Sequence, residues 1–230
     1  MKFLVIDGET CNTPIIDGQL DYQSGQNYDL GGKVIDEFGH VYDQFNLVIE
    51  EVFFGMKEQM QEAYYADKIP QYLEEMRMQQ RKIVNIWEAY TIVRQMCKKW
   101  NITCIVAHNA KFDITTLNAT LRYQTKSKRR FFFPYGTHIV DSMKVAKMVL
   151  NDNKNYIDFC EMNGYVTNHK TPRPRYTAEI LWRYFSNNND FIEAHTGLAD
   201  VEIESQIFVK CLEALRCKAS FRRRENLTLL

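Results

Sequence analysis

The sequence of 230 residues has no excess of charge of either sign, because 29 lysines and arginines balance 29 aspartates and glutamates. This balance excludes a field over the whole molecule that would attract nucleic acid or a membrane, so a polyanion must meet local basic patches. The chain also lacks an apolar run of the roughly 18 residues that span a bilayer. Its six cysteines form no CxxC pair, which argues against structural zinc and against a disulfide framework. We therefore expect a cytoplasmic protein without a membrane segment.

The composition is that of an ordinary globular protein, with 45% apolar and 25% charged residues. The chain contains no internal repeat, and its apolar start at Phe3–Ile6 ends at Asp7 without the cleavage-site pattern of a signal peptide. The length favours one domain with an insertion over two separate domains. We expect a single domain over residues 1–216, with a helical insert at about 55–100, and a short basic tail at 217–230.

Changes in hydrophobic periodicity predict the order of strands and helices. Phe3–Ile6 and Ile102–Ala107 are short apolar runs typical of buried strands, and residues 28–35 and 41–49 flank a turn and predict a hairpin. A tight early turn and later helical crossovers predict an α/β fold, in which helices cover both faces of a mixed sheet with an early antiparallel hairpin and later parallel strands. The remaining expected elements are a strand segment at 131–140, a helix after Ala107, and helices near 142–150, 156–163, 177–186 and 198–216.

Acidic residues follow the first buried strand. Asp7 and Glu9 are two positions apart, so in extended backbone their side chains point to the same face and can share a ligand. Acids in a solvated turn after a strand give the same pattern. Asp113 follows the second buried strand at a helix start, where it is equally suited to stabilise the helix N-terminus.

A third segment, His195-Thr-Gly-Leu-Ala-Asp200, offers a histidine and another acid. Five residues of helix rotate by roughly 140°, so both side chains face one site only if His195 lies on the entry loop and Asp200 in the first turns. Together, Asp7, Glu9, Asp113 and Asp200 carry four negative charges that two Mg²⁺ ions would balance. Such a pair of ions suits phosphodiester hydrolysis, and a histidine with a pKa near 6.5 can act as the general base.

These segments resemble the three motifs of the DEDDh 3'-5' exonucleases, in the order Ile-Asp7-Gly-Glu9-Thr10, Ala-His108-Asn109-Ala-Lys-Phe112-Asp113 and His195-Thr-Gly-Leu-Ala-Asp200. The resemblance runs from residue 3 to about 216. Thr196 stands where the tyrosine branch of the family would have its tyrosine, and Gly197 replaces a usual alanine. By resemblance, the fold is ribonuclease H-like, and Asp7, Glu9, Asp113 and Asp200 hold two Mg²⁺ or Mn²⁺ ions, with Asp7 bridging them. His195 is the general base, and nucleotides leave a 3' end one at a time as 5'-monophosphates.

The resemblance also implies residues that hold the terminal nucleotide, namely Thr10, Asn109 and Phe112. Their hydroxyl, amide and aromatic groups suit sugar, phosphate and base, although Phe112 is equally suited to core packing. Two further acids stay outside the expected ligand set. Asp141 is expected to cap the next helix, and Glu204, one helical turn beyond Asp200, is a rival carboxylate.

A basic loop is the expected contact for the rest of the substrate. It places five positive charges in nine residues with no acid among them, at Arg122, Lys126, Lys128, Arg129 and Arg130. The expected partners are 3' ends of single-stranded DNA or RNA, with DNA slightly favoured. Two alternatives stay open: a nucleic-acid-binding module without turnover, and a proofreading partner of a polymerase. The sequence does not identify a protein partner, which could be a polymerase or a second copy of the chain.

Overall fold

The computed structural model describes residues 1–11, 15–16, 19–20 and 25–228. Its main sheet has six strands in the order β10-β9-β1-β6-β7-β8. The strands are β1 (Lys2–Asp7), β6 (Asp29–Asp36), β7 (Val41–Ile49), β8 (Lys82–Val84), β9 (Cys104–Ala107) and β10 (His138–Asp141). Short pairs lie outside it: β2 (Thr10–Cys11) with β5 (Gln26–Asn27), and β3 (Ile15–Ile16) with β4 (Gln19–Leu20).

The sheet is mixed, as the sequence predicts. β6 pairs antiparallel with both β1 and β7, forming the expected hairpin, whereas β9 runs parallel to both β1 and β10. β8 adds a parallel edge beside β7. Because β1 and β9 are parallel, their carboxyl ends lie side by side at the same end of the sheet. The polar residues that follow each strand begin there.

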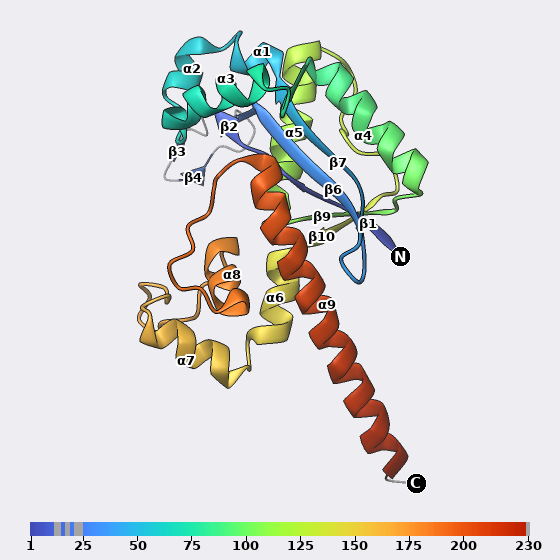
Figure 1. Ribbon diagram of the computed structural model, residues 1–230, viewed down its shortest axis with the longest axis vertical. Helices are drawn as coiled ribbons and strands as arrows, with labels where there is room; N and C mark the ends of the chain where they lie inside the picture. Colours follow the sequence, from blue (N-terminus) through green and yellow to red (C-terminus); the bar gives the residue numbers. More distant parts are fainter. Residues whose placement is uncertain (12–14, 17–18, 21–24, 229–230) are drawn as a thin grey trace.

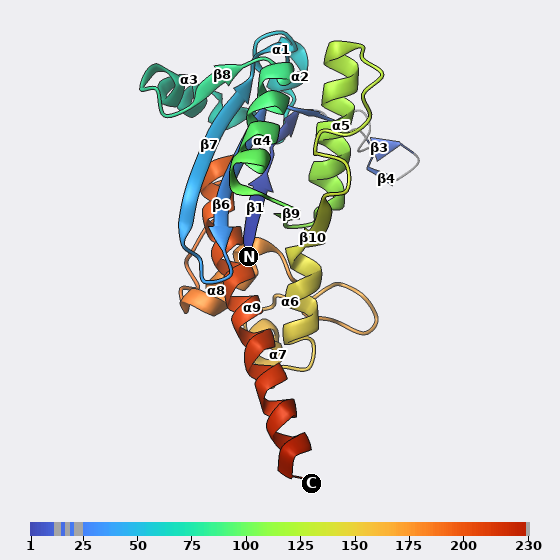
Figure 2. The ribbon, with the colours of Figure 1, turned by 90° about the vertical axis from the view of Figure 1, so that its right-hand side faces the viewer.

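Helices cover both faces of this sheet (Figure 1). They are α1 (Glu50–Phe53), α2 (Lys57–Gln61), the 3-10 helix η1 (Ala66–Lys68), α3 (Ile69–Arg77), α4 (Ile86–Trp100), α5 (Lys111–Thr125), α6 (Ser142–Leu150), α7 (Lys154–Met162), α8 (Ala178–Ser186) and α9 (Gly197–Thr228). In Figure 2, α4 and α5 lie on one side of the strands and α9 on the other.

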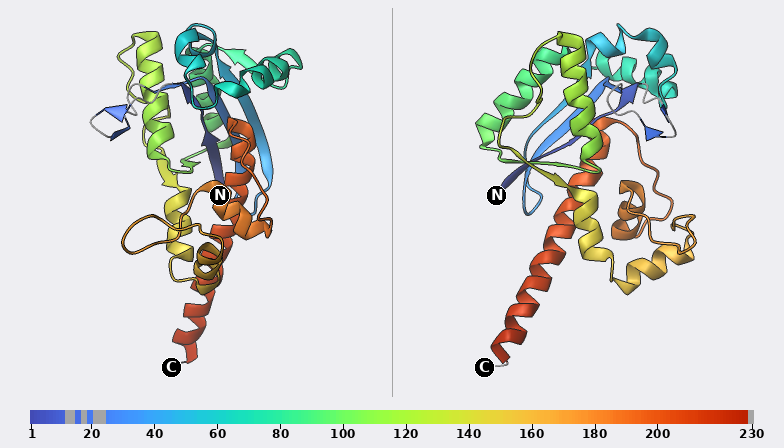
Figure 3. Two further views of the ribbon diagram at one scale, coloured as in Figure 1. Left: turned by 90° about the vertical axis from the view of Figure 1, so that its left-hand side faces the viewer. Right: turned by 180° about the vertical axis from the view of Figure 1, so that it is seen from behind.

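The alternation of side chains along β1 explains how one strand serves both layers. Leu4 and Ile6 pack in the cluster that includes α4 and α5, while Phe3 and Val5 pack in the cluster of α9. Successive strand residues point to opposite faces, so an unbroken apolar run is what a strand covered on both faces requires. A third cluster joins α6, α7, α8 and α9, which group beyond the sheet in Figure 3.

Three elements differ from the sequence prediction. The expected helical insert contains the three-residue strand β8, whose run is too short to stand out from its surroundings. The strand expected at 131–140 is confined to β10, because Pro134 and Gly136 hold the preceding segment in turns. The basic tail expected at 217–230 is a continuation of α9 to Thr228, since the sequence after Gly197 has neither proline nor glycine to stop the helix. Within the described residues, no helix has the length and apolar character to span a membrane.

Candidate functional site

Three segments that are far apart in the sequence meet at the carboxyl ends of β1 and β9. Asp7 is the last residue of β1, and Asp113 lies in the first turn of α5, directly after β9. The parallel pairing of these strands brings both acids to the same side. Asp200 joins them from the first turn of α9, which packs across β1 and β6. Sheet topology and one long helix therefore assemble the carboxylates.

These residues line a cavity of about 390 Å³. A ligand atom of Glu9, one of His195 and one of Asp200 lie within 4.8 Å of one another. The structure therefore brings together all five residues that the sequence singles out for metal binding and proton transfer. The full lining is Asp7, Gly8, Glu9, Tyr65, His108, Asn109, Phe112, Asp113, Met143, Thr177, Ala178, Glu193, His195, Asp200 and Glu204.

The carboxylates strongly perturb one another. Burial raises the pKa of Asp7 well above its ordinary value, and the charges of Glu204, Asp113, Glu9 and Asp200 raise it further. Burial likewise raises the pKa of Glu9 to about 9 and those of Asp113 and Asp200 to about 8. Buried carboxyl groups with this much mutual repulsion keep protons near neutral pH unless a cation neutralises them.

Two further acids, Glu193 and Glu204, lie in the same cavity. Glu204 is buried and raises the pKa of Asp7 more than any other charged neighbour does. Its position four residues after Asp200 on α9 is a sequence signal for this placement. Glu193 precedes α9 in a segment without regular structure, and burial raises its pKa to about 7. No periodic pattern in the sequence indicates Glu193. The cavity thus holds two more carboxyl groups than the four acids of the sequence prediction.

The backbone at His195 is unusual, with a φ of 52° in the left-handed region. Its ring stacks on Tyr65 with centroids 4.3 Å apart and planes at 14°. Nδ1 lies 3.9 Å from a carboxylate oxygen of Glu193. Partial burial lowers the pKa of His195, and Lys68 lowers it further while Glu179 opposes the shift. The imidazole is therefore neutral at pH 7 and can accept a proton.

The donor set fits divalent cations. Within the part of the chain that the structure describes, only three buried side-chain polar atoms have no hydrogen-bond partner. Two of them, Asp113 Oδ1 and Glu204 Oε2, belong to residues that line this cavity. Buried oxygens are rarely left unpaired in proteins, and carboxylate oxygen is the ligand that Mg²⁺ and Mn²⁺ prefer.

Comparison with solved structures shows a shared fold. A 3'-exonuclease that recognises the 3' end of a histone mRNA stem-loop is similar over 92% of this chain and 81% of its own, with a TM-score of 0.54 and 11% identity. The chain shares the fold of this protein. The nuclease domain of 3'hExo bound to rAMP has a TM-score of 0.47 and 12% identity, covering 92% of each chain. E. coli Exonuclease I with a dT13 oligonucleotide has a TM-score of 0.49 and 12% identity, over 96% of this chain and 43% of its own. Neither protein-family models nor curated sequences gave a match.

The residues expected to hold a terminal nucleotide divide into two groups. Asn109, with a φ of 65°, and Phe112 line the cavity. Thr10 pairs with Asn27 in the short β2–β5 ribbon and does not line it. Asp141 accepts hydrogen bonds from the N–H groups of Met143 and Lys144, so it caps α6 as expected.

The basic loop lies at the opposite end of α5 from the acidic cavity. Arg122, Lys126 and Arg130 line a second cavity of about 580 Å³. Arg129 has a different role, because its guanidinium donates to the Tyr90 hydroxyl at 2.9 Å and lies 5.1 Å over the ring of Trp87. The exposed Lys128 does not line the cavity. The loop therefore does not meet the acidic cavity directly.

Proposed function

We propose that the protein is a metal-dependent 3'-5' exonuclease that releases 5'-nucleoside monophosphates from single-stranded nucleic acid. The observation that carries this proposal is the convergence of Glu9, His195 and Asp200 within 4.8 Å, in a cavity that Asp7 and Asp113 also line. The shared fold supports the same reaction class. Single-stranded DNA is the first substrate to test, and RNA of the same sequence is the alternative.

Asp7, Glu9, Asp113 and Asp200 would hold two divalent cations, Mg²⁺ or Mn²⁺. Such ions lower the pKa of bound water and stabilise the oxygen that leaves the phosphodiester. Glu204 is a further oxygen donor at this site, because its Oε2 is buried without a hydrogen-bond partner. Two ions carry four positive charges, so the extra acids of the cavity would keep protons or contact the ions through water.

Other residues of the cavity accept the proton and hold the substrate. His195 accepts the proton of the attacking water, since its lowered pKa keeps the imidazole neutral at pH 7. Asn109 and Phe112 lie in the cavity lining where a terminal sugar and base would be held. Thr10 would act through the position of Glu9, its neighbour in sequence.

A row of residues on α5 provides a path for the rest of the strand. Phe112 lines the acidic cavity, Thr115 and Ala119 follow at helical spacing, and Arg122 and Lys126 line the basic cavity. The helix rises 1.5 Å per residue, so this path is about 21 Å long. At roughly 3.4 Å per stacked nucleotide, about six nucleotides would cover it. We assign phosphate contacts to Arg122, Lys126 and Arg130, and we expect Arg129 to fix the loop to α4.

The test uses oligonucleotides labelled at the 5' end, of DNA and of RNA, with free or phosphate-blocked 3' ends. Mg²⁺ or Mn²⁺ should give a ladder that shortens from a free 3' end, and the released products should be 5'-monophosphates. Chelator and Asp7→Asn should each abolish the ladder, whereas exposed Asp158→Asn should not. Cleavage by Asp7→Asn at the wild-type rate would overturn the proposal.

The basic cavity favours a second candidate, a nucleic-acid-binding module without turnover. It contains three cations and no acid among its lining residues, at a distance from the acidic cavity. Salt-sensitive oligonucleotide binding without cleavage in either metal would favour this candidate.

A further inference from the structure

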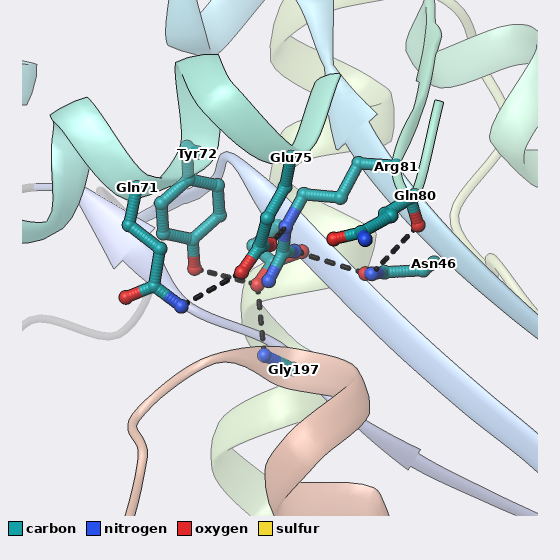
Figure 4. A network of polar contacts seen from close by, with 8 residues as sticks. Asn46, Gln71, Tyr72, Glu75, Gln80, Arg81 and Gly197 are labelled. Carbon is teal, nitrogen blue, oxygen red and sulfur yellow. Dashed lines mark hydrogen bonds and ion pairs between the residues drawn. The ribbon is translucent and has the colours of Figure 1, made fainter. Parts of the chain in front are cut away.

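The helical segment 57–81 contacts the segment that bears His195 at two separate places. One contact is made by the Tyr65 ring. The other is made by the side chains of Tyr72 and Arg81, which lie above Gly197 in Figure 4 and act through the buried Asp29 of β6. The catalytic motifs do not include any of these four residues. Their arrangement indicates what this segment does.

Asp29 connects three elements. Its carboxylate accepts hydrogen bonds from the Tyr72 hydroxyl at 2.6 Å, from the Arg81 guanidinium at 2.5 Å and from the Gly197 N–H at 2.8 Å. The side chain is fully buried. Replacing a buried ion pair by apolar residues is often neutral for stability. Stability therefore does not explain why Asp29 and Arg81 are buried here, whereas the hydrogen bond from the Gly197 N–H to Asp29 gives the pair a positioning role.

The backbone at Gly197 has almost no room to move toward the sheet. A Cβ atom on Gly31 of β6 would lie 2.3 Å from the Gly197 carbonyl carbon, and a Cβ on Gly197 would lie 2.7 Å from the Gly31 nitrogen. Side chains at either position are excluded, so the start of α9 rests directly on β6. The Asp29 hydrogen bond then fixes the N–H group two residues after His195.

Tyr65 holds the other side of the same segment. Its ring lies parallel to the His195 imidazole at 4.3 Å, from the turn between α2 and η1. His195 has a left-handed φ of 52°, which is strained for a non-glycine residue and persists only where neighbouring contacts impose it. The stacked ring and the fixed Gly197 N–H are two such contacts.

We propose that segment 57–81 is a clamp that positions His195, with Tyr65 holding the ring and Tyr72 and Arg81 holding the backbone through Asp29. This inference rests on the proposed function, because it makes Tyr65 and Tyr72 positioning residues for the general base. They act through His195 and do not touch the reacting atoms.

The first experiment does not need activity. In the NMR spectrum of the full chain, the ring current of Tyr65 should shift the Hε1 signal of His195 upfield, and His195→Gln assigns that signal. Tyr65→Leu should remove the shift, whereas Tyr65→Phe should retain it. Tyr135→Leu is the matched control, since Tyr135 is 94% exposed. An unchanged His195 signal in Tyr65→Leu would overturn the clamp, whether or not the protein cleaves nucleic acid.

The second experiment is a double-mutant cycle on cleavage. Tyr65→Leu should lower kcat about tenfold with little change in KM, Tyr65→Phe should restore the rate, and Tyr65→Leu should cost nothing more in a His195→Gln background. A rise in KM alone, or an undiminished loss in that background, would assign Tyr65 to the substrate and overturn its positioning role.

Tyr72→Phe tests the backbone half of the clamp. It removes one hydroxyl and keeps the ring, and it should lower kcat about threefold. Tyr42→Phe is the matched control, because the Tyr42 hydroxyl donates to Asp36 at 3.0 Å, outside the residues that line the cavity. Equal kcat values in the two variants would overturn the backbone contact. If Asp7→Asn abolishes cleavage while Tyr72→Phe and Tyr42→Phe have equal kcat values, the proposed function stands and only the backbone contact is wrong.

Discussion

When a chelator removes divalent cations, the free energy of unfolding should fall as pH rises, because the acidic cavity confines carboxyl groups that repel one another. Asp200 sets the magnitude, since burial raises its pKa to about 8, whereas an aspartate in an unfolded chain ionises near 3.9. Keeping Asp200 ionised in the fold would cost roughly 6 kcal/mol, because the pKa shift of about 4 units corresponds to about 1.4 kcal/mol per unit. That is a large part of the 5–15 kcal/mol by which proteins are typically stable.

The sign of the effect follows from the protons that each state binds. Between about pH 4 and pH 8, the folded protein keeps a proton on Asp200 that the unfolded chain has lost, so stability falls as pH rises and levels off above the folded pKa. Burial lowers the pKa values of His108 and His195. Their contribution is complete above about pH 6.5 and is lost on acidification, so the range from pH 6.5 to 8 isolates the carboxyl groups.

The assay is urea unfolding followed by tryptophan fluorescence at pH 6.5, 7.2 and 8.0. In EDTA, the free energy of unfolding should fall from pH 6.5 to 8.0 by up to about 2 kcal/mol for each carboxyl group that keeps its proton only in the folded protein. Mn²⁺ or Mg²⁺ should reverse the loss, because a cation that binds only the folded state stabilises it. Asp200→Asn should weaken the pH dependence and should be more stable than wild type at pH 8 in EDTA. Exposed Asp158→Asn should follow wild type. A free energy that stays constant or increases from pH 6.5 to 8 in EDTA would refute the reasoning.

Three further predictions follow from the described contacts. His195→Ala should lower kcat by roughly 10²–10⁴ without weakening oligonucleotide binding, because only proton transfer is lost; single-turnover kinetics and filter binding check this. Neutralising Arg122, Lys126 and Arg130 should raise KM for a dodecamer and reduce its salt slope, while KM for a dinucleotide, which is too short to reach the basic cavity, stays at the wild-type value. Gly197→Ala places a Cβ 2.7 Å from backbone nitrogen, so we expect a loss of about 1–3 kcal/mol of stability in urea unfolding and slower cleavage. Equal salt slopes, or a wild-type rate for either single variant, would contradict the corresponding assignment.

Much of the fold is predictable because it depends on local patterns. The apolar run of β1 ends at Asp7, and the run of β9 leads into the helix that bears Asp113, so the positions of these acids follow from strand order alone. Glu204 follows Asp200 by one helical turn, so the two side chains share a face of α9 and the spacing indicates that both reach the cavity.

Other features depend on contacts that no local pattern records. Glu193 lies in an irregular segment, and Tyr65 lies in a turn between short helices, so no periodicity indicates that they meet at His195. The split within the basic loop has the same origin. Arg129 packs on Trp87 and Tyr90 of α4, and five neighbouring cations in a sequence do not reveal which of them has an aromatic partner.

The parallel pairing of β8 with β7 sets a minimum length for the connection that contains segment 57–81. These strands run parallel, Leu47–Ile49 beside Lys82–Val84, and two parallel neighbours need a crossover of a dozen or more residues between them. The segment is part of that connection, so shortening it to a tight turn would detach the edge strand. Apart from Tyr65, Tyr72 and Arg81, which contact His195 or Asp29, its side chains can be exchanged, but its length is required by the parallel pairing of β7 and β8.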